Sequence, residues 1–343
     1  MARRAGLTLA GLLALLMMLG DRVAPNSAAE QFADRAWAPP MPLRLDGAAV
    51  IAHPLRMHDR LGRTFREDTS QRIEIDWFSR GRLIATRASD PEPLLLFGAD
   101  TLGRDVLARV AGAARWSLGV AVTGSLLAIA LGALFGAIAA SGSRLVDRLV
   151  VASATALATL PIVYIVLTLR AALPLVMAPR DVFIALALLF GIVGWPLTAR
   201  GVRGILMRER ALDYAQAARA AGASRLRLMT VHLLPATSGF LVTQFLILVP
   251  GFLLSEVTLS FLGLGFPEPT PSWGTMLQDA SNVRVIADAP WMLAPAAAIA
   301  VTSLALHLAA GRPLLSGGAP YTPPGSVARG APSPRSASSR SSR

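Results

Sequence analysis

The chain has 343 residues, of which 53% are hydrophobic and only 16% are charged. Soluble proteins of this size carry roughly 25% charged residues, so lipid is expected to be the solvent for much of the surface. The net charge is +12, every basic residue is arginine, and neither lysine nor cysteine occurs. These absences exclude a P-loop ATPase site, a Schiff-base lysine, a disulfide and a zinc-thiolate site. The positive charge fits the loops around membrane spans better than a nucleic-acid partner.

Six segments approach or reach the roughly 20 apolar residues that a membrane span needs. The first, residues 6–19, follows Arg3 and Arg4 as a signal-peptide core does, but no small-residue cleavage site follows it. We therefore expect an uncleaved N-terminal transmembrane helix over residues 1–20. The other five segments carry no charged side chain and cover residues 117–140, 149–169, 182–199, 236–255 and 290–311. The expected fold class is an all-α polytopic membrane helix bundle with about six transmembrane helices.

Glycine and proline positions predict how these helices pack. Gly132 and Gly136 form a small-xxx-small pair that permits close helix contact. Pro161 and Pro250 lie inside expected spans and should kink them, because proline cannot supply the helical N–H.

Arginine in the short loops predicts the orientation. Arginines precede the first span, and the loops at 141–148 and 200–231 are also rich in arginine. The tail from Arg312 carries arginines and no acidic residue. With six spans all of these segments fall on one side, so both termini are expected in the cytoplasm.

The remaining segments complete the expected domain organisation. Residues 21–112 form an extracytoplasmic loop or small subdomain, in which 73–78 and 83–85 have β character. Residues 113–311 form the transmembrane core, with a cytoplasmic coupling loop at 200–235. Residues 312–343 are rich in Ser, Pro, Gly and Ala and read as a disordered basic tail. The four histidines form no metal-binding pattern, although His53 and His58 lie five residues apart.

The loop at 200–235 is the most informative part of the chain. The pattern predicts an amphipathic helix over 209–220 that ends at Gly222, and a second helix from Arg225 towards Pro235. Its surface is mostly alanine, which lets another protein approach the backbone closely. A docking helix for a cytoplasmic partner and a helix that lies on the lipid surface fit this pattern equally well.

This loop resembles the cytoplasmic EAA loop of binding-protein-dependent ABC importer permeases. The signature here is Gln216-Ala217-Ala218, then Gly222, then His232-Leu233-Leu234-Pro235. Two further segments, 98–118 and 255–277, resemble the dipeptide/oligopeptide/nickel branch of that family, so the resemblance runs from about residue 98 to about residue 295. The chain departs from the pattern at Gln216, which replaces a glutamate, and again after the last span.

The resemblance implies a type I ABC importer permease of the bacterial inner membrane that catalyses no covalent chemistry. It implies that di- or oligopeptides are transported, with nickel or another small solute as an alternative. A membrane scaffold without transport activity is the alternative outside the class of transporters.

The implied partners are a homologous permease, two ABC ATPase subunits that bind the ATP, an extracytoplasmic solute-binding protein and membrane lipid. The chain itself is expected to hold no cofactor or metal. The residues expected to couple to the ATPases are Glu209, Asp213, Tyr214, Gln216, Ala217, Ala218, Gly222, His232 and Pro235.

Segments 98–118 and 255–277 contain charged residues and glycines for which we expect further roles. Glu256 falls inside or near the membrane, where a carboxylate is costly, so it is a candidate to line the solute path or a gate, or to pair with an arginine of the partner subunit. The alternative is a helix-end residue at the headgroup level, if Pro250-Gly251 ends the span first. Gly263 and Gly265 allow a tight turn or a close helix contact beside Glu256. In segment 98–118, Asp100 is expected to cap a helix on which Asp105 and Arg109 lie four residues apart. This pattern fits a capped helix at the membrane interface, and the alternative is a contact with the external binding protein.

Overall fold

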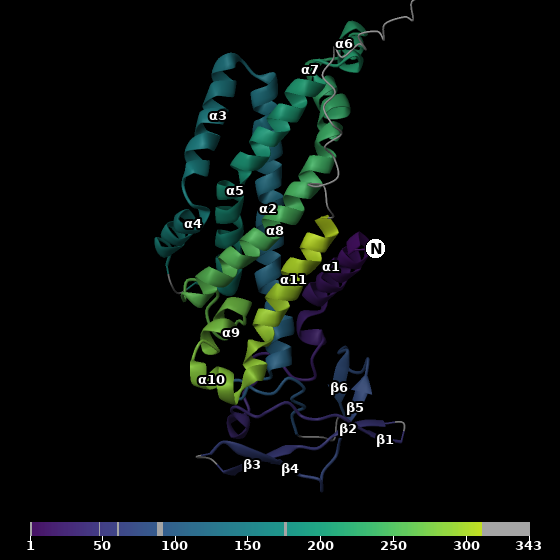
Figure 1. Ribbon diagram of the computed structural model, residues 1–343, viewed down its shortest axis with the longest axis vertical. Helices are drawn as coiled ribbons and strands as arrows, with labels where there is room; N and C mark the ends of the chain where they lie inside the picture. The colour runs from purple at the N-terminus through teal and green to yellow at the C-terminus, as the bar shows by residue number, and fades with distance from the viewer. Residues whose placement is uncertain (1, 48, 60–61, 88–91, 175–176, 311–343) are drawn as a thin grey trace, which may run out of the picture. The chain divides into compact units, whose positions relative to one another are not determined.

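The computed structural model describes residues 2–47, 49–59, 62–87, 92–174 and 177–310. The expected tail at 312–343 lies outside these residues. Helices dominate the described part, and short strands occupy its N-terminal third (Figure 1). The longer helices are α1 (Ala2–Leu19), α2 (Val106–Ser141), α3 (Arg144–Thr159), α4 (Ile162–Ala171), α5 (Pro179–Glu209), α8 (Ser238–Phe261) and α11 (Ala294–Ala310).

Among the described residues, four helical stretches are long and apolar enough to cross a membrane, or five if the bent pair α3–α4 is one span. The four are α2, α5, the stretch Arg225–Phe261 that ends with α8, and the stretch Pro290–Ala310 that ends with α11. Six spans were expected. The first expected span falls short, because the apolar part of α1, Thr8–Leu19, is shorter than a full span, and the expected span 149–169 is divided between α3 and α4.

The two prolines behave differently. Pro161 separates α3 from α4, and the two helices meet at an angle of 87°. The kink expected there is therefore confirmed as a complete break. At Pro250 helix α8 continues without interruption to Phe261. The span accordingly includes Glu256.

The helices pack around α2, which contacts α5 most extensively and also α8, α1 and α3. The close packing expected at Gly132 and Gly136 is confirmed. A Cβ atom on Gly132 would lie 2.5 Å from Cβ of Thr198, and one on Gly136 would lie 2.6 Å from the carbonyl oxygen of Ala199. The main core lies between α2, α5 and α8, where Phe190 stacks on Phe252 with ring centroids 4.8 Å apart.

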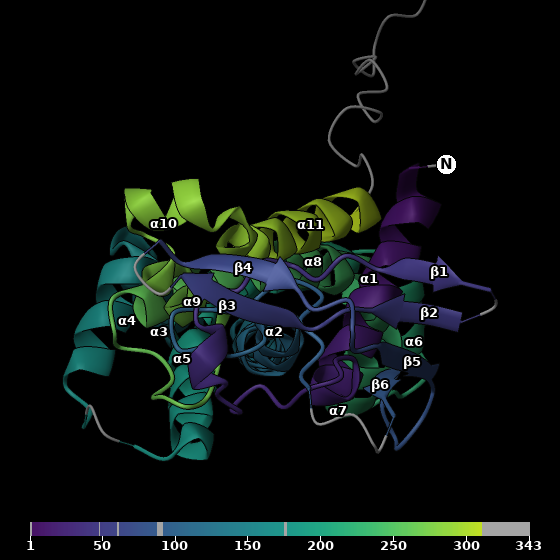
Figure 2. The ribbon, with the colours of Figure 1, turned by 90° about the horizontal axis from the view of Figure 1, so that it is seen from below.

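The segment between α1 and α2 folds into two small sheets (Figure 2). Four antiparallel strands in the order β1-β2-β5-β6 form one sheet, and the hairpin β3–β4 forms the other. The strands are β1 (Arg44–Asp46), β2 (Ala49–Ala52), β3 (Leu55–Asp59), β4 (Thr64–Glu67), β5 (Ile73–Trp77) and β6 (Ile84–Thr86). Both stretches expected to have β character are confirmed as β5 and β6. The expectation of an all-α chain holds for the membrane part and not for this segment.

Short helical elements connect the spans. They are η1 (Gly20–Arg22), η2 (Ala33–Arg35), α6 (Asp213–Ala220), α7 (Arg225–Arg227), η3 (Leu228–Leu233), η4 (Leu234–Thr237), α9 (Trp273–Asp279), α10 (Val283–Asp288) and η5 (Pro290–Leu293).

Candidate functional site

Helix α6 is the centre of the expected coupling segment and lies at the end of the helices opposite the strands (Figure 1). The expected helix over 209–220 is divided in the structure, because α5 continues to Glu209 and α6 begins only at Asp213. Leu212 has an extended backbone between the two helices. Asp213 lies in the first turn of α6, where a negative charge interacts favourably with the helix dipole.

One alanine anchors α6 to the membrane helices. Ala215 is fully buried and packs in a cluster with Ala140 at the end of α2, Val202 and Leu206 of α5, and Leu228 and Leu233 of η3. Ala218 is half-buried against the same cluster, while Gln216, Ala217 and Arg219 are exposed. The outer face of α6 is thus an exposed surface of small and polar side chains, and its inner face is held against α2, α5 and η3.

Hydrogen bonds fix the start of α6. The Tyr214 hydroxyl donates to Oε2 of Glu209 over 2.8 Å, and Nε2 of Gln216 donates to the carbonyl oxygen of Ala211 over 3.0 Å. Partial burial and the bond to Glu209 raise the pKa of Tyr214. The amide at position 216 therefore supports the turn between α5 and α6, a role that needs no charge.

Gly222 ends α6 as expected. Its φ is +84°, in the left-handed region that glycine adopts readily, and the N–H of Ala223 donates to the carbonyl oxygen of Ala218 over 3.0 Å. A Cβ atom at this position would meet nothing within 4 Å. The requirement for glycine is therefore one of backbone conformation alone.

The expected second helix starts at Arg225 but is irregular. The short α7 leads into the π-helical turn η3, which contains His232, and then into the 3₁₀ turn η4 with Pro235. Proline supplies no N–H to the helical ladder, which accounts for a change of helix type at this point. His232 is half-buried and Pro235 is exposed.

Two arginines of α5 and its C-cap tie this segment to neighbouring helices. Arg203 donates to both carboxylate oxygens of Asp147 in α3, with 2.7 Å between Nη2 and Oδ2. Arg210 donates to the carbonyl oxygen of Ala140 at the end of α2. These contacts fix the end of α5, after which α6 follows, to α2 and α3.

At the opposite end, two sequence segments about 160 residues apart meet in an ion-pair cluster. Arg104 donates to Asp100 over 2.7 Å and to Glu268 over 2.6 Å. Arg109 is fully buried, with Asp100 at 3.5 Å and Glu268 at 3.4 Å. We call these residues, together with Asp279 at 3.7 Å from Arg104, the outer ion-pair cluster.

The helix cap in this region differs from the expectation. Asp105, not Asp100, is the N-cap of α2, and its side chain accepts from the N–H groups of Leu107 and Ala108. Asp100 instead accepts from the N–H groups of Leu102 and Arg104 and holds the loop. The expected Asp105–Arg109 pair is absent from the ion pairs of the described residues, because Arg109 points towards the outer ion-pair cluster.

Glu256 lies fully buried in α8, and Oγ of Ser260 donates to its Oε1 over 2.6 Å. Its Oε2 has no hydrogen-bond partner among the described residues. Gly263 has a φ of +77° at the end of α8, and a Cβ atom on Gly265 would lie 2.6 Å from Cα of Ser260. The tight turn and the close contact expected of these glycines are confirmed, while a role in a path or gate stays a prediction.

Trp273 is a residue of this region that the sequence analysis missed. It is fully buried, its indole N–H donates to the carbonyl oxygen of Val110, and its backbone N–H donates to Oγ of Ser117. It fastens α9 to α2. A single tryptophan in an otherwise polar turn is the feature of the sequence that could have predicted this buried contact.

Comparison with known proteins agrees with this architecture. Residues 132–312 match the family described as "Binding-protein-dependent transport system inner membrane component". A protein named as a peptide permease from Brucella ovis is 38% identical over 212 residues, which is 62% of this chain and 68% of the relative. One named as a peptide transport system permease from Brucella suis is 37% identical over 68% of this chain and 77% of its own length. The oligopeptide transport system permease protein OppC of Bacillus subtilis is 31% identical over 62% of this chain and 67% of its own length.

The matched region contains α6, η3, α8 and α9, so the coupling segment and part of the outer ion-pair cluster lie within the family's common part. A multi-pass protein that joins such a transporter is its non-catalytic membrane component. The chain therefore belongs to the family of inner-membrane permease components of binding-protein-dependent ABC transporters.

Proposed function

We propose that the chain is one of two homologous permeases of an ATP-driven peptide importer. The assignment to peptides is supported by the relatives from Brucella and by OppC, which are named for peptide transport. Two ABC ATPases and an extracytoplasmic solute-binding protein complete the transporter. Both termini lie in the cytoplasm, and the strand-bearing segment 21–97 lies outside.

The coupling role is supported by the way in which α6 packs on the membrane helices. Its inner face is fixed through Ala215 to α2, α5 and η3, and its outer face is exposed. Exposed apolar side chains accompany it, with Leu212 and Tyr214 each 41% exposed and Leu226 73% exposed. In the assembled transporter this face docks on an ATPase, and closure of the ATPase pair on ATP pushes α6 and the helices fixed to it.

A disulfide crosslink tests this docking, and the natural absence of cysteine makes the background clean. We expect Ala217→Cys, on the exposed face, to crosslink to a cysteine in the docking groove of the ATPase that co-purifies with the chain. The yield should change when ATP is added. Ala215→Cys is the matched control on the buried face of the same helix and should give no crosslink. Equal yields from both positions, or none from Ala217→Cys in membrane-inserted protein, would contradict docking through α6.

The solute is tested separately in the reconstituted transporter. A binding protein loaded with short peptides should stimulate ATP hydrolysis several-fold more than the same protein without peptide. Stimulation by nickel and not by peptides would replace the peptide proposal with the nickel alternative.

A further inference from the structure

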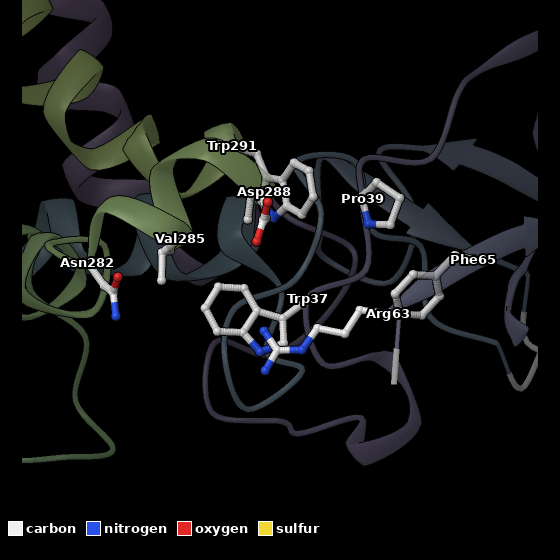
Figure 3. Close-up of a pocket in the computed structure, with 10 residues that line it drawn as sticks. Trp37, Pro39, Arg63, Phe65, Asn282, Val285, Asp288 and Trp291 are labelled. Carbon is white, nitrogen blue, oxygen red and sulfur yellow. The ribbon is translucent and has the colours of Figure 1, made fainter. Parts of the chain in front are cut away.

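A cavity of about 760 Å³ lies where the strand-bearing segment meets the turn around α10 and η5 (Figure 3). This volume is within the range of about 300–1,000 Å³ that is usual for small-molecule sites. The strand-bearing segment supplies Trp37, Pro39, Gly62, Arg63 and Phe65, and the α10–η5 turn supplies Asn282, Val285, Asp288, Ala289 and Trp291. The cavity is remote from α6, and the family motifs explain none of its charged residues.

The cavity combines aromatic walls with one charge of each sign. The guanidinium of Arg63 lies over the Trp37 ring, with its carbon 4.9 Å from the ring centroid. Asp288 and Trp291 line the same cavity from the α10–η5 turn (Figure 3). Neither Arg63 nor Asp288 takes part in an ion pair in the described part of the chain. Each is therefore available to a ligand group of the opposite charge.

One wall of the cavity is rigidly held. The indole N–H of Trp291 donates to the carbonyl oxygen of Ala99 over 3.0 Å. Gly98 lies so close that a Cβ atom there would be 2.8 Å from the indole nitrogen. Trp291 is thus fixed to the loop of the outer ion-pair cluster, and a ligand in the cavity would contact a part of the chain that is connected to α2.

The opposite wall has an unusual backbone. Trp37 has a φ of +65° and Arg63 a φ of +48°, a region that side-chain-bearing residues seldom adopt. Residues held in this way cost about 1–3 kcal/mol each and are concentrated at functional sites. Of the four such non-glycine residues in the described part of the chain, Trp37 and Arg63 form the cation–π contact in the cavity, and Phe78 and Arg80 do not line it.

A second cavity of about 730 Å³ shares Trp37 and Arg63 with the first. Its wall includes Asp34 together with Arg35 and Arg56. Arg35 is paired there with Asp34 and Glu92, and Arg56 is paired with Asp68 and Glu92. Of the guanidinium groups that line this second cavity, that of Arg63 is therefore the one without an ion-pair partner among the described residues, and it is the group that a negative ligand would meet.

We propose that this cavity binds short peptides with free termini directly on the permease, with the ammonium at Asp288 and the carboxylate at Arg63. The apolar side chains of the peptide then lie against the indoles of Trp37 and Trp291. A free peptide carries both charges at its two ends, and acetylation or amidation removes them one at a time. The charged side chains of a docking protein would not respond to these changes, so the two kinds of ligand can be told apart. The proposal rests on peptide import as the proposed function.

The test measures binding of trileucine to the full-length chain, purified with its co-purifying subunits in lipid nanodiscs and without the solute-binding protein, by titration calorimetry. N-acetyl-trileucine and trileucine amide each lack one terminal charge. We expect each modification to weaken binding about fivefold, the effect of a partly exposed charge pair. The loss on acetylation should disappear in Asp288→Asn, and the loss on amidation should disappear in Arg63→Gln.

Matched controls come from a surface ion pair of the same segment, Arg72 and Asp46, which are 2.7 Å apart. Asp46→Asn and Arg72→Gln should keep both losses. The proposal is overturned if trileucine does not bind, or if the two cavity variants retain both losses. It is also overturned if the cavity variants weaken only the affinity for the loaded binding protein, since the cavity would then be a docking surface. Peptide-stimulated ATP hydrolysis of the complete transporter is measured in parallel, so that failure of the cavity is distinguished from failure of peptide import.

Discussion

Burial and hydrogen bonding have opposite effects on the pKa of a single residue, Asp105. The carboxylate is completely buried at the start of α2, where two backbone N–H groups and Nδ2 of Asn26, at 2.8 Å, donate to it. Burial outweighs these hydrogen bonds and the charge of Arg82, and it raises the pKa of Asp105 to about 6. The folded protein therefore binds a proton at Asp105 more tightly than the unfolded chain does.

This predicts a pH dependence of stability. A raised carboxyl pKa stabilises the folded state fully below the unfolded value of 3.8, and this contribution is lost as pH rises through about 6. Asp105→Asn keeps a good N-cap and removes the titration. We expect the stability of the wild type relative to Asp105→Asn to fall by about 2 kcal/mol between pH 4 and pH 7. Thermal unfolding of both proteins across this range measures it, and a constant difference would contradict the assignment.

The backbone conformation of Gly222 at the end of α6 leads to a second prediction about a single residue. Because a Cβ atom there would meet nothing, a substitution acts only through the positive φ. We expect Gly222→Val to cost about 1–2 kcal/mol of local strain and to reduce the amount of solute transported per ATP hydrolysed. Gly222→Asn should remain close to wild type, because asparagine tolerates this conformation. A comparison of transport per ATP hydrolysed measures the effect, and equal coupling in Gly222→Val would argue against a fixed helix end.

At the scale of elements, the outer ion-pair cluster joins the loop before α2 to the segment between α8 and α9. Its members differ in exposure. The Arg104 side chain is 3% exposed and that of Asp100 is 2% exposed, whereas that of Glu268 is 52% exposed. The buried Asp100–Arg104 pair therefore holds the loop before α2 in shape, whereas the contacts with Glu268 and Asp279 connect this loop to the second segment.

The difference predicts unequal effects of neutralising each partner. Glu268→Gln should lower the free energy of unfolding by less than about 1 kcal/mol, as for exposed ion pairs. Arg104→Gln should lower it by about 3 kcal/mol, because it deprives buried Asp100 of its nearest cation. Thermal unfolding in detergent distinguishes the two variants. Equal losses would mean that the carboxylate of Glu268 is held as firmly as that of Asp100.

Helices and their ends could be predicted where one local feature of the sequence, such as an apolar run or a glycine, determines them. The long apolar runs gave α2, α5, α8 and α11, and Gly222 marked the end of α6. The strands β1 to β4 were not recognised, since they are only three to five residues long and most of their side chains are exposed. The outer ion-pair cluster and the cavity at Trp37 could not be predicted either, because both join residues that are far apart along the chain.

At the scale of the whole chain, charge and hydropathy predict which parts lie on which side of the membrane. The strand-bearing segment and α6 belong to opposite ends of the helices (Figure 1). Leu45 on β1 is 79% exposed, and Ala220 at the end of α6 is also exposed. Because the chain has no cysteine, each position can carry the only thiol.

The predicted orientation follows from the arginine-rich loops. In intact cells with a permeabilised outer membrane, Leu45→Cys should react with a charged maleimide and Ala220→Cys should not. Both should react after the inner membrane is broken, which controls for access to the thiol. The reverse pattern in intact cells would place the termini outside.

The length of α2 has a mechanical consequence. Its 36 residues correspond to about 54 Å, well beyond a hydrocarbon core of about 30 Å. The helix has no internal proline, and four of its glycines lie against α5, namely Gly119, Gly124, Gly132 and Gly136. We therefore expect α2 to move as a rigid unit together with α5. A tilt of about 5° around its midpoint would displace each end by about 2 Å in opposite directions. A displacement of the α2 end at Ala140 would therefore appear at Asp105 as a displacement of similar size in the opposite direction.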